Sequence, residues 1–274
     1  AVPLIGDLYP DAVGRAVGVH GVAAQAAAVV APTLTVALVA AASWRAVFWL
    51  LAALGATLTL ALVGVARRRE GGVPSGADRD FRAALSHWRI ILAAVVMIGG
   101  AGFVWQGVFN FYVTYLVEKG LSPTRAGTLL TVAFAAGLPA FWLSGRLADR
   151  LPHVPYILTL GAGVAVGVAA LTVAESLVAL VAVSVALGLA AHSLFPALDA
   201  YVLGAIPDNR GSAYAVYGGL ALLVQATGSG AVGLLGERFA FDAVFQGFAA
   251  GLLALVSLLA GLYLAGGFPT TDAA

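Results

Sequence analysis

The sequence predicts an all-α membrane protein with about eight transmembrane helices. Hydrophobic residues make up 61% of the 274 residues, charged residues make up 10%, and the mean hydropathy is +0.99. Because a soluble domain carries about 25% charged residues, lipid must be the solvent for most of this chain. Several runs of about 20 residues are almost free of charge, which is the length needed to cross the hydrocarbon core of a bilayer.

The charged and reactive residues exclude several other classes of protein. The formal net charge is +1 and no basic stripe is present, so we expect no nucleic-acid partner. With no cysteine, the chain has no disulfide, no thiolate metal site and no cysteine nucleophile. Its four histidines are scattered over different segments, so we predict neither an enzyme nor a metal or other cofactor. The absence of a Gly-x-x-x-x-Gly-Lys-Ser/Thr loop argues against ATP as the energy source.

Apolar runs that end at charged or turn residues predict eight spans and one long polar link. The link is the segment 67–89, which begins with four charged residues and continues through glycine and proline. Residues 1–8 are predicted to be the tail of one more helix, which enters the turn at 9–11. The predicted spans are 14–40, 45–66, 90–116, 124–144, 154–174, 177–203, 212–235 and 243–267.

The distribution of basic residues predicts the orientation in the membrane, because cytoplasmic loops are enriched in arginine and lysine. If the 67–89 loop is cytoplasmic, the C-terminus lies on the same side, and that side holds ten basic residues against four on the other. We therefore expect a multi-pass protein of the cell membrane, the inner membrane of a prokaryote, with its C-terminus inside. The ten are Arg15, Arg67, Arg68, Arg69, Arg79, Arg82, Arg89, Arg146, Arg150 and Arg210, and the four are Arg45, Lys119, Arg125 and Arg238.

An internal repeat appears when the sequence is shifted by 197 residues without gaps, so that Pro10 falls on Pro207. The offset holds through a turn, a helix, a second turn and a second helix, which composition alone does not explain. Both copies start on the same side of the membrane, so the repeat is parallel. The matched pairs are Pro10/Pro207, Asp11/Asp208, Gly14/Gly211, Ala16/Ala213, Val19/Val216, Gly21/Gly218, Ala24/Ala221, Ala46/Ala243, Val47/Val244, Phe48/Phe245 and Gly64/Gly261.

The repeat predicts how the chain divides. Residues 1–66 would be the remainder of a first half, 67–89 a cytoplasmic central loop, and 90–274 a second half of six helices. Because 90–206 has no counterpart within the chain, we expect about four further helices of the first half upstream of residue 1 in a twelve-helix protein.

The turn between the predicted spans 124–144 and 154–174 reads Gly145-Arg146-Leu147-Ala148-Asp149-Arg150. It resembles the Gly-x-Leu-Ala-Asp-Arg signature of the major facilitator superfamily, in its second-half position. The turns Pro10-Asp11 to Arg15, Pro207 to Gly211 and Trp44-Arg45 also look like those of the family. The chain departs from the signature at 151–154, where glycine and basic residues would follow. The resemblance implies an MFS-type bundle, running here from the end of helix 4 to helix 12, and alternating-access transport of a small solute.

The resemblance also implies a gate. The Asp149 carboxylate would accept hydrogen bonds from the start of the helix near Asp11–Arg15. This contact would form while the cavity faces outward and break when the cavity faces inward. Gly145 would let the two helices approach closely. The alternative is that the arginines only anchor the turn and enforce topology. The predicted gating residues are Gly145, Arg146, Asp149, Arg150, Arg15 and Arg210.

Three ionisable residues lie inside predicted spans, where charge is costly and usually functional. His192 and Asp199 are seven residues apart and share one side of a helix, so we expect them to carry a coupling proton. For Asp199 the alternative is that it caps a helix or reaches the interface. His20, the third candidate, falls on Tyr217 under the shift of 197.

Polar residues on helix faces are the candidates for the substrate cavity, because in the family these helices border it. Interhelical hydrogen bonding is the competing role. The candidates are Gln25, Gln106, Asn110, Tyr112, Tyr214, Tyr217 and Gln225.

Gly18 and Pro32 match by type the antiporter signature of the family, which favours efflux. The expected partners are therefore the lipid bilayer, a small-molecule substrate and a coupling proton, with the protein a monomer. Alternatives are an uptake symporter or uniporter for a sugar or organic anion, an inactive fragment, or a membrane receptor. A receptor predicts neither the parallel repeat nor the Gly145–Arg150 turn.

Overall fold

The computed structural model describes residues 2–68, 80–206 and 210–268 of the chain. Within them the secondary structure is helical with no strand, and eight helical segments are long and apolar enough to cross a membrane, which confirms the predicted all-α class. The helices are α1 (Val2–Leu8), α2 (Val13–Ala41), α3 (Trp44–Arg68), α4 (Phe81–Ser86), α5 (Trp88–Glu118), α6 (Pro123–Ala135), α7 (Gly137–Ala148), α8 (His153–Val173), α9 (Leu177–Ala205), α10 (Arg210–Gly236) and α11 (Phe241–Leu264), with a 3₁₀ turn at Pro10–Ala12.

The helix boundaries follow local chemistry. Ser122 and Ser176 accept hydrogen bonds from the backbone N–H groups of Arg125 and Ala179 and so cap the starts of α6 and α9. The span predicted at 124–144 consists of α6 and α7, with a break at Ala136. The predicted link 67–89 contains the short helix α4, which Asp80 caps.

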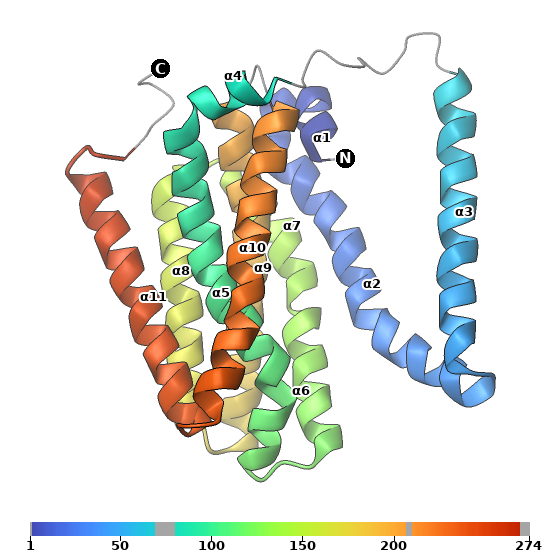
Figure 1. Ribbon diagram of the computed structural model, residues 1–274, viewed down its shortest axis with the longest axis vertical. Coiled ribbons are helices and arrows are strands. Elements are labelled where there is room, and N and C mark those ends of the chain that lie inside the picture. Colours follow the sequence, from blue (N-terminus) through green and yellow to red (C-terminus); the bar gives the residue numbers. More distant parts are fainter. Residues whose placement is uncertain (1, 69–79, 207–209, 269–274) are drawn as a thin grey trace.

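Helices α5 to α11 form one bundle, and α1 and α2 join it at one end (Figure 1). We call this the motif end, because the Gly145–Arg150 turn, α4 and the first residues of α2 and α10 lie there. From the motif end α2 leans away from the bundle, and α3 stands apart beside it (Figure 1). No residue in the membrane-spanning window of α3 is buried, and its Trp49 is 75% exposed. An exposed apolar surface of this kind suits lipid, not water.

The core of the bundle is built from large apolar side chains on α5, α8, α9 and α11. Leu116, Ile157, Leu187 and Phe245 are fully buried there. Lipid tails are as apolar as these side chains, so packing and interhelical hydrogen bonds hold such a bundle together.

At the end opposite the motif end, Lys119 and Tyr115 link three helices of the bundle. Its Nζ atom donates to the carbonyl oxygens of Leu171, Thr172 and Ala174 at the end of α8, at 2.7–3.2 Å. These carbonyls carry the partial negative charge of a helix C-terminus, which a cation offsets. The neighbouring Tyr115 hydroxyl donates to Asp242 of α11 at 2.5 Å. The network makes α5, α8 and α11 one rigid group.

Glycines allow α2 to cross α7 with their backbones almost in contact. A methyl group added at Gly14 would lie 2.5 Å from the Gly145 carbonyl oxygen, and one at Gly18 would lie 2.5 Å from the Phe141 carbonyl oxygen. A side chain on Gly145 would collide with the Gly14 carbonyl in turn. The small residues at this crossing are therefore required for the two helices to meet.

We predict that Gly18→Ala separates α2 from α7. Overpacking of this kind costs about 1–3 kcal/mol, enough to shift the distance between spin labels at Ala12→Cys and Leu151→Cys toward longer values. Double electron–electron resonance (DEER) measures that distance, and the chain has no cysteine of its own to interfere. Gly55→Ala in α3 is the control, since nothing lies within 4 Å of the added methyl group. Equal distance distributions in the two variants would contradict the prediction.

Candidate functional site

The Asp149 carboxylate at the end of α7 caps the start of α2. The backbone N–H of Gly14 donates to Oδ1 at 2.7 Å, and the backbone N–H of Arg15 donates to Oδ2 at 2.9 Å. The first N–H groups of a helix lack partners within the helix and carry partial positive charge, so a carboxylate is the ligand they favour. The contact predicted from the sequence is present. Its role as a gate stays a prediction.

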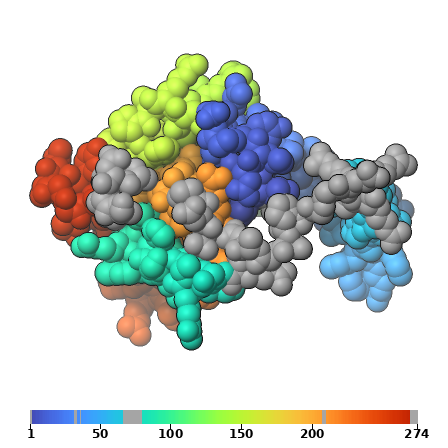
Figure 2. Space-filling view, turned by 90° about the horizontal axis from the view of Figure 1, so that it is seen from above, coloured from blue at the N-terminus to red at the C-terminus, as the bar shows by residue number. Residues whose placement is uncertain are grey.

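Three of the predicted gating arginines surround this contact. Arg15, Arg146 and Arg150 line one crevice at the motif end, together with Asp11 and Asp149. Figure 2, which looks onto this end, shows the blue N-terminal residues packed against the yellow-green turn after α7.

Arg146 also stacks over Trp142, with its guanidinium carbon 3.7 Å from the ring centroid. Trp142 is exposed, so this pair suits the interfacial anchoring that we weighed as the alternative role.

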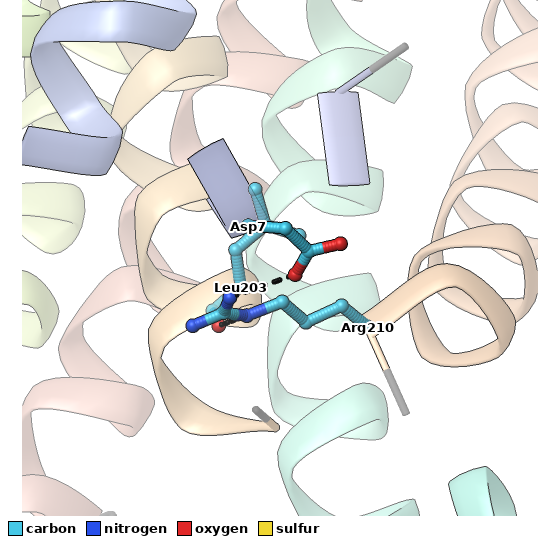
Figure 3. A network of polar contacts seen from close by, with 3 residues as sticks. All are labelled: Asp7, Leu203 and Arg210. Atoms are coloured by element: carbon cyan, nitrogen blue, oxygen red, sulfur yellow. Dashed lines mark hydrogen bonds and ion pairs between the residues drawn. The ribbon is translucent and has the colours of Figure 1, made fainter. Parts of the chain in front are cut away.

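A second contact across the motif end joins α1 to α10 (Figure 3). The Arg210 guanidinium donates from Nη1 to Asp7 Oδ1 at 2.9 Å and from Nε to the Leu203 carbonyl oxygen at 2.9 Å. Arg210 was predicted as a gating residue, whereas Asp7 was missed. The sequence did hold a signal, because a lone carboxylate in the predicted helix tail 1–8 needs a partner.

Farther along α2, Gln25 reaches the bundle and meets His192. Its Nε2 atom donates to the Phe134 carbonyl oxygen at 2.7 Å and lies 3.2 Å from His192 Nε2. The other ring nitrogen, Nδ1, lies 2.7 Å from the Gly188 carbonyl oxygen. Both side chains are buried. The sequence suggested the two residues for different roles, a cavity lining and a proton site, and did not pair them.

Aromatic rings enclose the His192 imidazole. The ring centroids of Trp105 on α5, Phe134 on α6 and Phe141 on α7 lie 5.4, 5.5 and 6.2 Å from it. His192 is thus shielded from solvent on the sides where α2 does not cover it.

Asp199 lies two turns further along α9, in a separate polar group. Its side chain is buried and shares a hydrogen bond with Tyr214 of α10. The Tyr214 and Tyr217 rings pack edge to face, with centroids 5.7 Å apart, and Tyr217 is buried. The structure therefore joins one predicted proton site to two predicted cavity residues.

The remaining candidates do not gather around one centre. Asn110 donates to Ser229 of α10 at 2.6 Å, and Ser229 donates to the Gln106 carbonyl oxygen at 3.2 Å, so these residues face α10. Tyr112 lies on another side of α5, where it is fully buried and hydrogen-bonded to Ser184 of α9. For Asn110 and Tyr112 the interhelical hydrogen bond, the competing role, is thus present.

Gln225 and His20 differ in their surroundings. Gln225 is buried against Gly102 of α5 and makes no hydrogen bond with the described residues. His20 is exposed on α2, although its repeat mate Tyr217 is buried. No cluster of three metal-ligating side chains occurs among residues 2–68, 80–206 and 210–268.

The family model of the Major Facilitator Superfamily matches residues 1–177 and 120–272, which together span nearly the whole chain. The chain belongs to this superfamily, and the secondary transport of solutes across membranes is what the family does. No curated protein matches the sequence.

We predict that Asp149→Asn weakens the closed arrangement of the motif end. Hydrogen bonds to a charged group contribute about 1.5–3 kcal/mol. In DEER with spin labels at positions 12 and 151, the population of the longer distance should therefore increase at least several-fold.

Two matched variants test the cause. Asp11→Asn removes a carboxylate from the same crevice that bonds to none of the described residues, and it should have no effect. Asp7→Asn removes an ion pair whose acid is 57% exposed and should have a smaller effect, because such pairs contribute about 0.2–1 kcal/mol. An effect of Asp11→Asn as large as that of Asp149→Asn would show that net charge, and not the cap on α2, matters.

Proposed function

We propose that this protein exports a small solute by alternating access and that the transport is coupled to protons. The observation that carries the proposal is the capping of α2 by Asp149 at the motif end, beyond which α2 diverges from the bundle. This is the arrangement expected of a transporter closed on one side and facing the other.

The motif end is assigned to the cytoplasm. The arginine count from the sequence supports this, with ten basic residues on that side against four. The protein then lies in the cell membrane of a prokaryote with its C-terminus inside, and the described conformation faces outward. The chain then divides into the remainder of the first half (1–66), the central loop (67–89) and the second half (90–274). Part of the loop, 69–79, lies outside the described residues.

The proposed proton sites are His192 and Asp199. Both are buried ionisable side chains within a membrane span, where a charge is tolerated only with a partner or a function. Asp199 is bonded to Tyr214, and His192 faces Gln25 across the contact between α2 and the bundle. His20 is less suited as a proton site, because its side chain is exposed and its charged form is not desolvated to a comparable extent.

The solute is proposed to be uncharged or to carry a single charge. The buried ionisable side chains of the described spans are few, so a multiply charged solute would lack counter-charges. A sugar or organic-anion symporter or uniporter is the rival within the same family. Gly18, in the close crossing of α2 and α7, lies where the antiporter signature of the family was matched, and so favours efflux.

Transport by the protein from its complete reading frame in proteoliposomes tests the proposal. An inward proton gradient is imposed, and lumenal pH is followed while a panel of amphiphilic drugs, sugars and carboxylates is added. We expect a proton flux with one class of compound, and we expect Asp199→Asn or His192→Gln to abolish it.

His87→Gln changes a half-buried histidine between α4 and α5, and as the control it should leave the flux unchanged. Solute movement without any proton movement, unaltered by the two variants, would leave a uniporter or a carrier driven by another ion.

A further inference from the structure

The hydrogen bonds of Gln25 occupy a special place on α2. Six residues of this helix are buried, and they follow one face from the motif end: Val13, Gly14, Val17, Gly18, Gly21 and Gln25. After Gln25 no described residue of α2 is buried. Gln25 is therefore where the buried face of α2 ends, and from the far end it is the first buried polar contact that a proton would meet.

The neighbours of Gln25 and His192 determine which atoms carry hydrogens. The Gly188 carbonyl can only accept, so His192 Nδ1 carries a proton and donates to it. In the neutral ring Nε2 is then an acceptor. The Phe134 carbonyl also can only accept, so Gln25 must present its NH₂ group there. The second hydrogen of the same NH₂ group is available to His192 Nε2 at 3.2 Å.

We propose that the Gln25–His192 pair is a proton-operated latch between α2 and the bundle, closed when the imidazole is neutral. The inference rests on the proposed proton coupling and deepens it. It assigns the proton-sensitive step to one hydrogen bond and makes Gln25 the residue that senses the charge state of His192.

Protonation of His192 removes the acceptor that the latch requires. Nε2 then carries a hydrogen that points at the NH₂ group of Gln25, so that donor faces donor. Rotating the amide by a half-turn gives Nε2–H an acceptor but places the amide oxygen against the Phe134 carbonyl oxygen, so that acceptor faces acceptor. Gln25 cannot satisfy both neighbours in either orientation, and a polar group buried without a partner is costly.

Within residues 2–68, 80–206 and 210–268, no charged side chain is in contact with the His192 ring as another partner for the imidazolium. The side chains that face the ring from α2, α5, α6 and α7 are Gln25, Trp105, Phe134 and Phe141, none of which titrates near neutral pH. Other titratable groups on the packed helices have partners elsewhere: Tyr112 with Ser184, Tyr115 with Asp242, Tyr156 with Ser144, His153 against Tyr201, Asp199 with Tyr214, and Asp7 with Arg210. His20 on α2 is exposed. Separation of α2 from α9 relieves the conflict.

The latch gives the proton a defined effect on the conformational equilibrium. A proton entering from the far end releases α2 at the point where its contact begins, which leaves Asp149 and the glycine crossing to hold the motif end alone. Leaving one buried polar group of this pair without a partner corresponds to about a tenfold change in the ratio of open to closed molecules.

DEER on the complete protein, labelled at Ala12→Cys and Leu151→Cys, tests the latch between about pH 8 and about pH 5, which spans the ordinary imidazole pKa of about 6.5. We expect the longer distance to gain about tenfold in population as the pH falls. His192→Gln should remove this response, because an amide at 192 does not titrate in the range, and His87→Gln should retain it.

Gln25→Glu separates a latch from a packing role. A carboxylate at 25 accepts from the imidazolium, so low pH should now favour the shorter distance, which reverses the sign of the response. Gln25→Leu should leave the distance independent of pH. A wild-type response that persists in His192→Gln, or that disappears in His20→Gln, would overturn the latch.

The transport assay keeps the two proposals apart. If proton-coupled transport is observed but the distance does not respond to pH, the proposed function stands and the latch is wrong. If the distance responds through His192 but no compound moves protons, the latch stands and the coupling is wrong.

Discussion

The backbone contact between α2 and α7 is the interaction on which the rest of the arrangement depends. Gly14, Gly18 and Gly145 bring the two helices so close that the first N–H groups of α2 reach the Asp149 carboxylate. The same approach places Gln25, two turns further along, against His192. A single larger side chain at the crossing would remove both polar contacts, because neither carboxylate nor amide could then reach its partner.

The polar contacts of α2 fall at two depths and differ in strength. The Asp149 cap involves a full charge and a helix terminus at the motif end, whereas the Gln25–His192 contact joins two neutral groups where the buried face of α2 ends. In a membrane each unpaired polar group is costly, so both contacts are held firmly once made. A free imidazole has a pKa of about 6.5 and a free aspartate carboxyl a pKa of about 3.9, so only the second contact contains a group whose ordinary pKa lies near the physiological range.

Hydrogen bonds between helices hold the bundle of α5 to α11 together. Lys119 binds three carbonyl oxygens at the end of α8, and Tyr115 bonds to Asp242 of α11. Tyr112 joins α5 to α9 through Ser184. These bonds all lie within the bundle, whereas α2 meets the bundle along one buried face that runs from the motif end to Gln25. A bundle held by its own hydrogen bonds, with a neighbouring helix attached along one face, suits a rocking motion.

The sequence alone determined the helical class, the eight spans and the motif turn, because hydropathy and turn chemistry are local properties of the chain. The contact of Asp149 with the start of α2 was predicted from the resemblance of the turn to the family signature, and helix ends supply the donors that a carboxylate favours. The pairs Gln25–His192 and Asp7–Arg210, and the burial of Tyr112 against Ser184, were decided only by the tertiary structure. They depend on how far one helix slides and rotates against another, and that register follows from packing across the whole bundle, which no local pattern encodes.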